Sequence, residues 1–155
     1  MRICLLFLSI FLSFVSINAR DGISEVETPL TERCMFDISM EKGHLSGIMI
    51  TKDRDDAIVG TMINEFGITA LSFIYDKHSQ KIKLENVIGF MNKWYIKRVL
   101  KGDIKYCLHI LYDMPVKENN NYVVSKTDNG ISIINSKRKI TYSFSPIQEQ
   151  NETEE

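Results

Sequence analysis

The sequence predicts an α+β domain in which a curved antiparallel sheet, shaped as a half-barrel, carries two helices on its concave face. Short segments that alternate apolar and polar residues lie at both ends of the domain, and this alternation is typical of strands with one buried face. Between them, residues 92–113 change to the three-and-four residue spacing of an amphipathic helix. Helices inserted between two groups of strands are expected to pack together on one face of the sheet.

The first residues are expected to direct export. Met1 and Arg2 precede an apolar run from Ile3 to Ile17, and Ala19 is a small residue at a cleavage position. We interpret residues 1–19 as a signal peptide that is removed. Retention as a membrane anchor is the alternative, although the run is shorter than the roughly 20 apolar residues that a spanning helix needs. The protein is therefore expected in the periplasm or the cell envelope.

The remaining chain has room for one folded domain. Cleavage after residue 19 leaves 155 − 19 = 136 residues. We expect a flexible leader over residues 20–31, a single half-barrel domain over 32–146 and a disordered acidic tail over 147–155. Without Arg2 the chain has 20 acidic and 18 basic residues, a net charge of −2. Nucleic acid is excluded as an expected partner, because phosphate binding favours a basic excess.

The first half of the domain predicts an antiparallel meander of five strands. Polar turns separate the alternating segments, among them residues 52–56 and 76–80. The predicted strands are residues 34–40, 45–51, 57–64, 68–75 and 81–85.

The third and fourth of these segments are apolar on both faces. Ile58, Met62 and Phe66 share one side, whereas Val59 and Ile63 share the other. A sheet covered by helices on its inner side needs only one apolar face. The second apolar face indicates contact with an opposite wall of the sheet, a partner or a bound apolar ligand. Partial exposure of these side chains is the simpler alternative.

Two helices are predicted after the meander. Asn92 can cap the first, Gly102 can end it, and Asp103 can cap the second, which extends to residue 113. In the second helix, four residues at positions i, i+3, i+4 and i+7 form one buried stripe. They are Ile104, Cys107, Leu108 and Leu111.

Three further strands are predicted at the C-terminal end. Pro115 stops helical structure, and strands follow at residues 122–125, 131–134 and 140–145, the first two joined by a hairpin turn over 127–130. Cys34 and Cys107 are the two cysteines of the processed chain. An oxidising compartment would permit a disulfide between them, but a buried stripe equally suits a reduced thiol at Cys107.

Catalytic and metal chemistry has little support in the sequence. His44, His78 and His109 are far apart and lack partners at metal-ligand spacing, and neither a nucleophile elbow nor a phosphate loop is present. Glu65 is the one acid in an apolar setting, and a structural role explains it more simply than catalysis. Asn64 and Gly67 are expected to form a turn. We predict a protein that is not an enzyme, with no catalytic residue, metal or cofactor.

One part of the sequence resembles a known group of proteins. The segment Asn64-Glu-Phe-Gly67 follows the strands at residues 45–50 and 57–63 and precedes the strand at 68–75 and a lysine-rich helix at 93–111. Over about residues 44–113 this order resembles small Bacteroidetes envelope proteins that are similar to the LolA/LolB lipoprotein carriers. The resemblance implies a half-barrel closed by helices, with an apolar cavity that takes up acyl chains of lipoproteins or related lipids.

These observations predict an exported, non-enzymatic envelope protein that binds a lipid or an acylated lipoprotein in an apolar cavity between the sheet and the helices. The alternative is an envelope protein–protein interaction module with a closed core and no ligand. Peripheral contact with the envelope membrane is compatible with either function, and the oligomeric state is left open. For Trp94, packing onto the sheet is the alternative to contact with a ligand. Alternation and helical spacing select these candidate cavity residues: Met49, Met62, Leu71, Phe73, Trp94, Ile104, Leu108 and Leu111.

Overall fold

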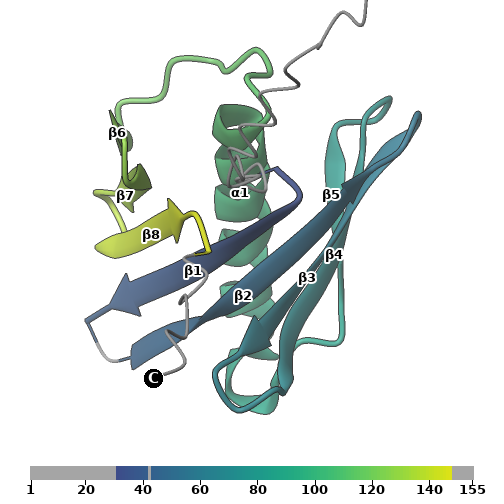
Figure 1. Ribbon diagram of the computed structural model, residues 1–155, viewed down its shortest axis with the longest axis vertical. Helices are drawn as coiled ribbons and strands as arrows, with labels where there is room; N and C mark the ends of the chain where they lie inside the picture. The colour runs from purple at the N-terminus through teal and green to yellow at the C-terminus, as the bar shows by residue number, and fades with distance from the viewer. Residues whose placement is uncertain (1–30, 42, 148–155) are drawn as a thin grey trace, which may run out of the picture.

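The computed structural model describes residues 31–41 and 43–147, which form an eight-stranded antiparallel sheet and one α-helix (Figure 1). The predicted signal peptide, nearly all of the predicted leader and most of the predicted acidic tail lie outside these residues. The strands are β1 (Arg33–Met40), β2 (Gly43–Asp53), β3 (Ala57–Asn64), β4 (Thr69–Asp76), β5 (Lys81–Glu85), β6 (Tyr122–Thr127), β7 (Gly130–Asn135) and β8 (Ile140–Ser145). The helix α1 spans Trp94–Leu111, and a short 3₁₀ helix η1 (Gly89–Met91) precedes it.

The sheet has the strand order β5-β4-β3-β2-β1-β8-β7-β6. The predicted meander is confirmed as β1 to β5, and β6 to β8 extend the sheet on the other side of β1. The first and last strands are therefore neighbours, with Phe36 of β1 opposite Phe144 of β8. An antiparallel pair needs only a short connection, so every pairing except that of β1 with β8 joins consecutive strands.

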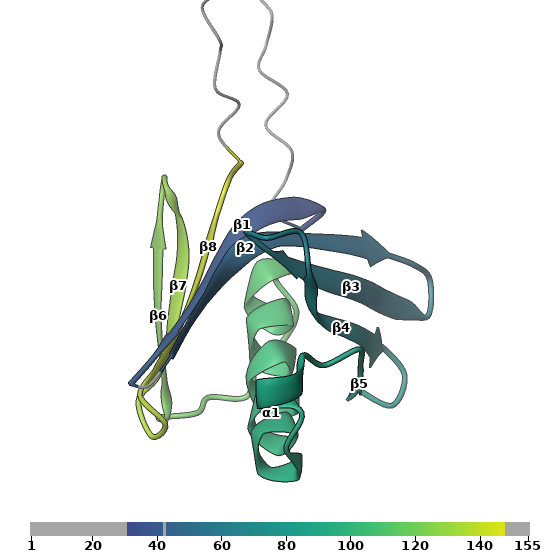
Figure 2. The ribbon, with the colours of Figure 1, turned by 90° about the horizontal axis from the view of Figure 1, so that it is seen from below.

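The sheet bends around α1, which lies inside the bend (Figure 2). This arrangement confirms the predicted α+β class with a curved antiparallel sheet. One glycine permits close packing on the concave face: a Cβ atom at Gly60 of β3 would lie 2.1 Å from the ring of Phe73, its partner on β4. The Phe73 ring therefore packs directly on the backbone of Gly60, in the space that the side chain of any other residue at this position would occupy.

The core lies between the concave face and one side of α1. Inward residues alternate along the strands, as Cys34, Phe36 and Ile38 of β1 show, except in β4, where the adjacent Ala70 and Leu71 are both buried. From α1 the predicted stripe is buried, together with Leu100. Both cysteines of the described chain, Cys34 and Cys107, are free thiols in this core.

The prediction of two helices is wrong for the described residues, because α1 continues without interruption through residue 102. Gly102 lies on the exposed side of the helix, where no atom would approach an added Cβ within 4 Å. The N-cap is Lys93, without a side-chain bond to the helix, so Asn92 does not act as the predicted cap. Asp103 does not cap a helix either, because its side chain points into the core. Packing of the continuous apolar stripe outweighs a single glycine, which costs about 1 kcal/mol in a helix.

The two apolar faces of the sheet have different environments. The inner face is core, whereas the outer face exposes Met35 (38 %) and Ile50 (45 %) to solvent. Phe66 does not share the face of Ile58 and Met62, because it lies in the turn after β3 and is 77 % exposed. Partial exposure therefore accounts for most of the second apolar face.

The turn between β3 and β4 has the predicted chemistry. The Asn64 side-chain oxygen accepts hydrogen bonds from the backbone amides of Phe66 (3.1 Å) and Ile68 (2.8 Å). Gly67 has φ +75°, a left-handed conformation that glycine adopts without strain. Glu65 is exposed in this turn, away from the apolar setting that its neighbours suggested.

His109 fastens the end of α1 to the sheet and to the following loop. Its Nδ1 is 2.7 Å from the carbonyl oxygen of Pro115, and its Nε2 is 2.9 Å from the hydroxyl of Tyr75. A neutral imidazole that donates from Nδ1 to the carbonyl accepts at Nε2 from the tyrosine. His109 does not belong to the predicted apolar stripe, but it is only 8 % exposed.

Candidate functional site

A pocket of about 620 Å³ lies where α1 begins, and we take it as the candidate functional site. Pockets of this volume are typical of small-molecule sites. Its walls come from the start of α1 on one side and from β8 and the ends of β6 and β7 on the other. The apolar part of the lining consists of Met40, Phe90, Met91, Trp94, Ile96, Val99, Leu100 and Ile140.

The mouth of the pocket is aromatic. Phe90, Trp94 and Tyr95 line it and are 58 %, 73 % and 50 % exposed. The rings of Trp94 and Tyr95 meet edge to face, with centroids 6.0 Å apart, a favourable geometry for aromatic pairs. Large apolar side chains are usually buried, so an exposed group of three at a pocket entrance marks a surface suited to binding.

The floor of the pocket is a buried polar cluster around Asp103. The carboxylate oxygen Oδ1 accepts hydrogen bonds from the Tyr122 hydroxyl (2.5 Å) and the Asn135 amide (2.8 Å), and Oδ2 accepts one from the Tyr142 hydroxyl (2.6 Å). Asp103 is 2 % exposed and Tyr142 1 %. Three donors compensate the desolvation of this carboxylate, which would otherwise be costly.

The tyrosines of the cluster remain protonated donors over the neutral pH range. Burial, reinforced by the neighbouring Asp103 carboxylate, raises the pKa of Tyr142 far above its ordinary value of 10.0. Burial and the hydrogen bond to Asp103 likewise raise the pKa of Tyr122. The ring of Tyr122 also stacks on Tyr106, with centroids 3.9 Å apart. The floor thus presents fixed aromatic rings, and the hydroxyls of Tyr122 and Tyr142 already donate to Asp103.

The rim of the pocket is basic. Arg98, Lys137 and Arg138 line it and are exposed. The ion pairs found between described residues involve none of these three. The pocket therefore combines an apolar wall, a negatively charged floor whose hydrogen bonds are made within the cluster, and a rim of positive charges.

The structure separates the eight candidate cavity residues into two groups. Trp94 lines the pocket and does not pack onto the sheet. The other seven are at most 6 % exposed, belong to the hydrophobic core and do not line this pocket. They are Met49, Met62, Leu71, Phe73, Ile104, Leu108 and Leu111.

Sequence reasoning missed most of the pocket. Asp103 carried a signal, because an acid four residues before Cys107 lies on the apolar stripe of the helix, where a buried partner is required. Tyr142 lies on the inward side of β8 and is 1 % exposed. Its meeting with Tyr122, Asn135 and Asp103 depends on pairing between distant segments, and no local pattern encodes that.

Apart from this pocket, the described residues contain no metal site or membrane-spanning helix that would indicate a particular class of protein. Residues 31–41 and 43–147 contain no group of three His, Cys, Asp or Glu side chains that could hold a metal ion. Within the same ranges, none of the helices is both long enough and apolar enough for a membrane span. His44 pairs with Asp37 at 3.2 Å and His78 with Asp56 at 2.9 Å, both in exposed positions.

The fold and the site together define an α+β domain with a curved antiparallel sheet and a pocket beside its helix. Comparison with protein-family models, with curated proteins and with solved structures finds no match for this chain.

Proposed function

We propose that the protein is a non-enzymatic binding protein whose pocket takes up an amphipathic molecule with an acyl chain and an anionic head, such as a lipid or the acylated end of a lipoprotein. The observation that carries the proposal is the sequence of environments along the pocket. Positive charges lie at the rim, an apolar wall lies below them, and the polar groups of the floor are already hydrogen-bonded to one another. The expected site of action is the cell envelope, after export.

The charges favour one orientation of such a ligand. An anionic head at the floor would meet the Asp103 carboxylate in a buried setting, where repulsion between like charges is strong. At the rim, the same head meets Arg98, Lys137 and Arg138 in contact with solvent. The chain would then lie along the apolar wall, where each buried methylene contributes about 0.8 kcal/mol before ordering costs.

Binding of a labelled fatty acid tests the proposal. Trp94 is the single tryptophan of the chain, so energy transfer from it to 11-(dansylamino)undecanoic acid reports occupancy of the pocket. We expect saturable transfer that unlabelled hexadecanoate reverses and hexadecyltrimethylammonium reverses less well. Absence of saturable transfer would contradict the proposal.

A pair of variants locates the site. Val99 lines the wall and is partly exposed, so Val99→Gln places an uncharged amide against the acyl chain without disturbing the core. An amide without a partner costs about 1–3 kcal/mol, and we expect about tenfold weaker binding or a greater loss. Val123→Gln on β6 is the matched control, because Val123 is exposed and does not line the pocket. Equal affinity in both variants would place the ligand elsewhere.

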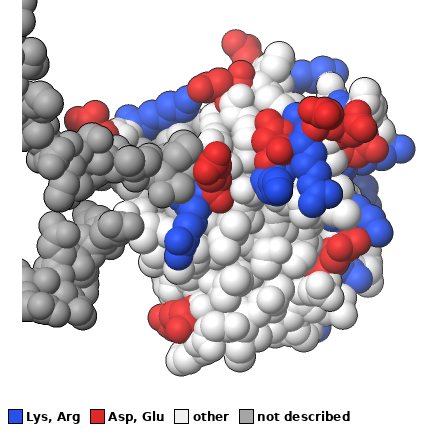
Figure 3. All heavy atoms as spheres, turned by 45° about the vertical axis from the view of Figure 1, so that its right-hand side comes forward, with Lys and Arg blue, Asp and Glu red and all other residues white. Residues whose placement is uncertain are grey.

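A second candidate function is an envelope interaction module, favoured by the outer face of the sheet. Met35 lies opposite Ile48, and Ile48 opposite Ile63, so apolar side chains cross three strands. Figure 3 shows a face on which charged side chains gather in the upper part and leave a broad, largely uncharged area below. The fatty-acid experiment separates the two candidate functions. An interaction module with a closed core binds no fatty acid, either as the parent protein or as the two valine variants.

A further inference from the structure

We propose that the mouth of the pocket docks on the anionic surface of a phospholipid bilayer. The proposal goes beyond ligand uptake, because docking requires only the exposed rim and not the interior of the pocket. It rests on three observations: the aromatic side chains at the mouth, the basic rim around them and the charge distribution of the whole molecule.

The aromatic side chains suit the boundary between water and lipid. Trp94 and Tyr95 each carry a polar atom on a large apolar ring, and such side chains concentrate at the headgroup level of membranes. Phe90, one turn earlier in η1, adds a fully apolar ring at the same mouth. All three are at least half exposed, so they reach a flat surface without rearrangement of the fold.

Two segments at the mouth are basic and contain no acid. Residues 86–102 contain Lys93, Lys97, Arg98 and Lys101 and no Asp or Glu, and residues 136–147 contain three basic residues and again no acid. Both segments contribute to the pocket. A cluster of this size next to exposed aromatic groups is typical of segments that bind anionic lipids.

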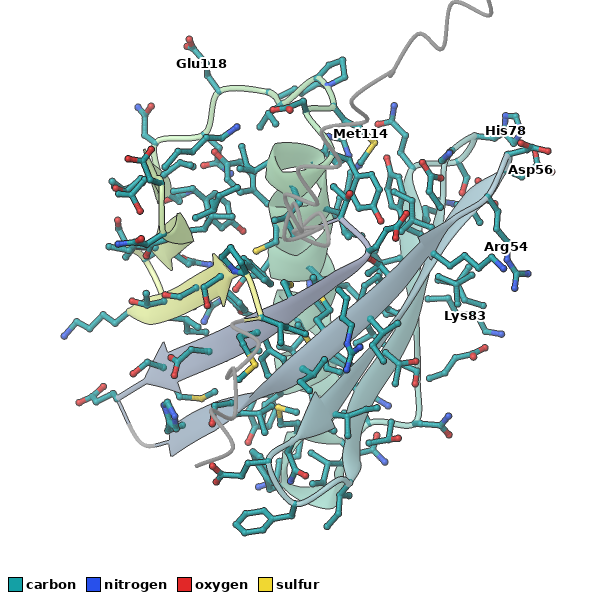
Figure 4. All side chains as sticks on the ribbon, viewed as in Figure 1. Arg54, Asp56, His78, Lys83, Met114 and Glu118 are labelled. Carbon is teal, nitrogen blue, oxygen red and sulfur yellow. The ribbon has the colours of Figure 1, made fainter. Side chains whose placement is uncertain are left out.

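The turns at the opposite end of the molecule carry charges of both signs. The turn after β2 contains Asp55 and Asp56, and Asp56 pairs with His78 at the tip shown at the upper right of Figure 4. The start of α1 lies at the lower end of Figure 1. The same turns and the strand ends beside them contain Lys52, Arg54, Lys77 and Lys81, so their charge is balanced. The mouth has a local excess of basic residues, and this excess turns it toward a negative surface although the formal net charge is −1.

An anionic bilayer fits these features better than an acidic protein. The mouth offers a ring of exposed side chains around an opening, which suits a fluid surface that adapts to it. A basic residue near an anionic membrane strengthens binding by about fivefold. Three rim residues, Arg98, Lys137 and Arg138, therefore account for about a hundredfold difference between anionic and neutral bilayers.

The test uses flotation with vesicles and the emission of Trp94. The protein, in the same form for every variant, is mixed with vesicles of phosphatidylcholine alone or of phosphatidylcholine with 30 % phosphatidylglycerol. We expect flotation, a blue shift of Trp94 emission and quenching by brominated lipid with the anionic vesicles, all reduced by 0.5 M NaCl. Trp94 reports on the mouth itself, and residues 1–30 contain no other tryptophan.

Two triple variants with the same change in net charge complete the test. Replacement of Arg98, Lys137 and Arg138 by Glu is expected to abolish the Trp94 response. Replacement of Lys52, Arg54 and Lys81 by Glu, all exposed and away from the pocket lining, is expected to retain it within about threefold. Equal loss in both variants, equal retention in both, or an equal response to neutral vesicles would overturn the proposal.

The outcome is independent of the proposed ligand. Val99→Gln adds no charge and leaves the mouth intact, so it is expected to float with anionic vesicles as the parent protein does while it binds fatty acid poorly. Flotation without fatty-acid binding in the parent protein would support docking and refute the proposed function. Fatty-acid binding without a response to anionic vesicles would support the proposed function and refute docking.

Discussion

At the scale of single residues, the buried cluster around Asp103 has the clearest energetic consequences. One carboxylate accepts three hydrogen bonds, from Tyr122, Asn135 and Tyr142, and no buried side-chain N or O atom of the described residues lacks a partner. The acceptor comes from the helix and the donors from three strands. This cluster therefore ties α1 to the C-terminal part of the sheet with directional bonds, where apolar packing alone would leave more freedom.

Asp103→Asn is expected to lower the free energy of unfolding by about 2–3 kcal/mol. The amide loses the charge that strengthens three hydrogen bonds, and its NH₂ group faces a donor. Urea denaturation followed by far-UV circular dichroism at pH 7 measures the effect. Asp113→Asn is the matched control, since Asp113 is exposed and pairs with exposed Lys126, and it should change stability by less than about 0.5 kcal/mol. Equal stability of the two variants would mean that the cluster contributes little.

The residue scale also marks a limit of what the sequence predicts. Asn64 and Gly67 were predicted correctly, because a turn depends on neighbours within a few positions. Trp94 was selected as a ligand contact and lines the pocket, although seven apolar residues chosen by the same reasoning lie in the core. Periodicity identifies which side chains point inward, but it does not distinguish a side chain that fills the interior from one that lines a hollow.

At the scale of elements, the observed strands agree closely with those predicted from the sequence, whereas the observed helix does not agree with the prediction. Predicted and observed strands differ by at most two residues at each end, since alternation and polar turns are local signals. The helix was divided at Gly102 and Asp103, which resemble a stop and a cap. In the folded protein the apolar stripe on both sides of this point packs on one sheet, and this packing keeps the helix continuous.

Gly102→Ala is expected to stabilise the protein by about 0.5–1 kcal/mol. The glycine is helical and exposed, and an added methyl group meets nothing within 4 Å, so the gain is the usual difference in helix propensity. The urea midpoint should rise without a change in slope. Gly60→Ala is the contrasting control, because its methyl group would collide with the Phe73 ring and should destabilise the fold. A lower midpoint for Gly102→Ala would indicate a break in the helix at this position.

At the scale of the whole molecule, the core contains several groups that must remain neutral. Burial raises the pKa of Cys34 from 9.0 to about 12 and raises the pKa of Cys107 as well. The pKa values of Tyr122 and Tyr142 are raised for the same reason, with Asp103 adding to the effect. All these groups lose their protons more readily in the unfolded chain than in the folded one.

Alkaline pH is therefore expected to destabilise the reduced protein. The stabilising contribution of each group is fully present below its unfolded pKa of 9.0 or 10.0 and is lost as pH rises toward its folded value. We expect a constant urea midpoint from pH 7 to about 8.5 and a steady fall from there to pH 11. Cys34→Ala should show a shallower fall relative to its own midpoint at pH 7. A midpoint that stays constant to pH 11 would contradict the burial of these groups.

The position of β1 in the sheet has a consequence for how the chain reaches this structure. Because β1 pairs with both β2 and β8, one of its edges stays open until β8 has been synthesised. The meander can assemble early, but the pocket walls formed by β8 and its neighbours arise only at the end. A chain without β8 would leave β1 as an unpaired edge of the sheet β5-β4-β3-β2-β1, so the pairing of β8 with β1 protects that edge from self-association.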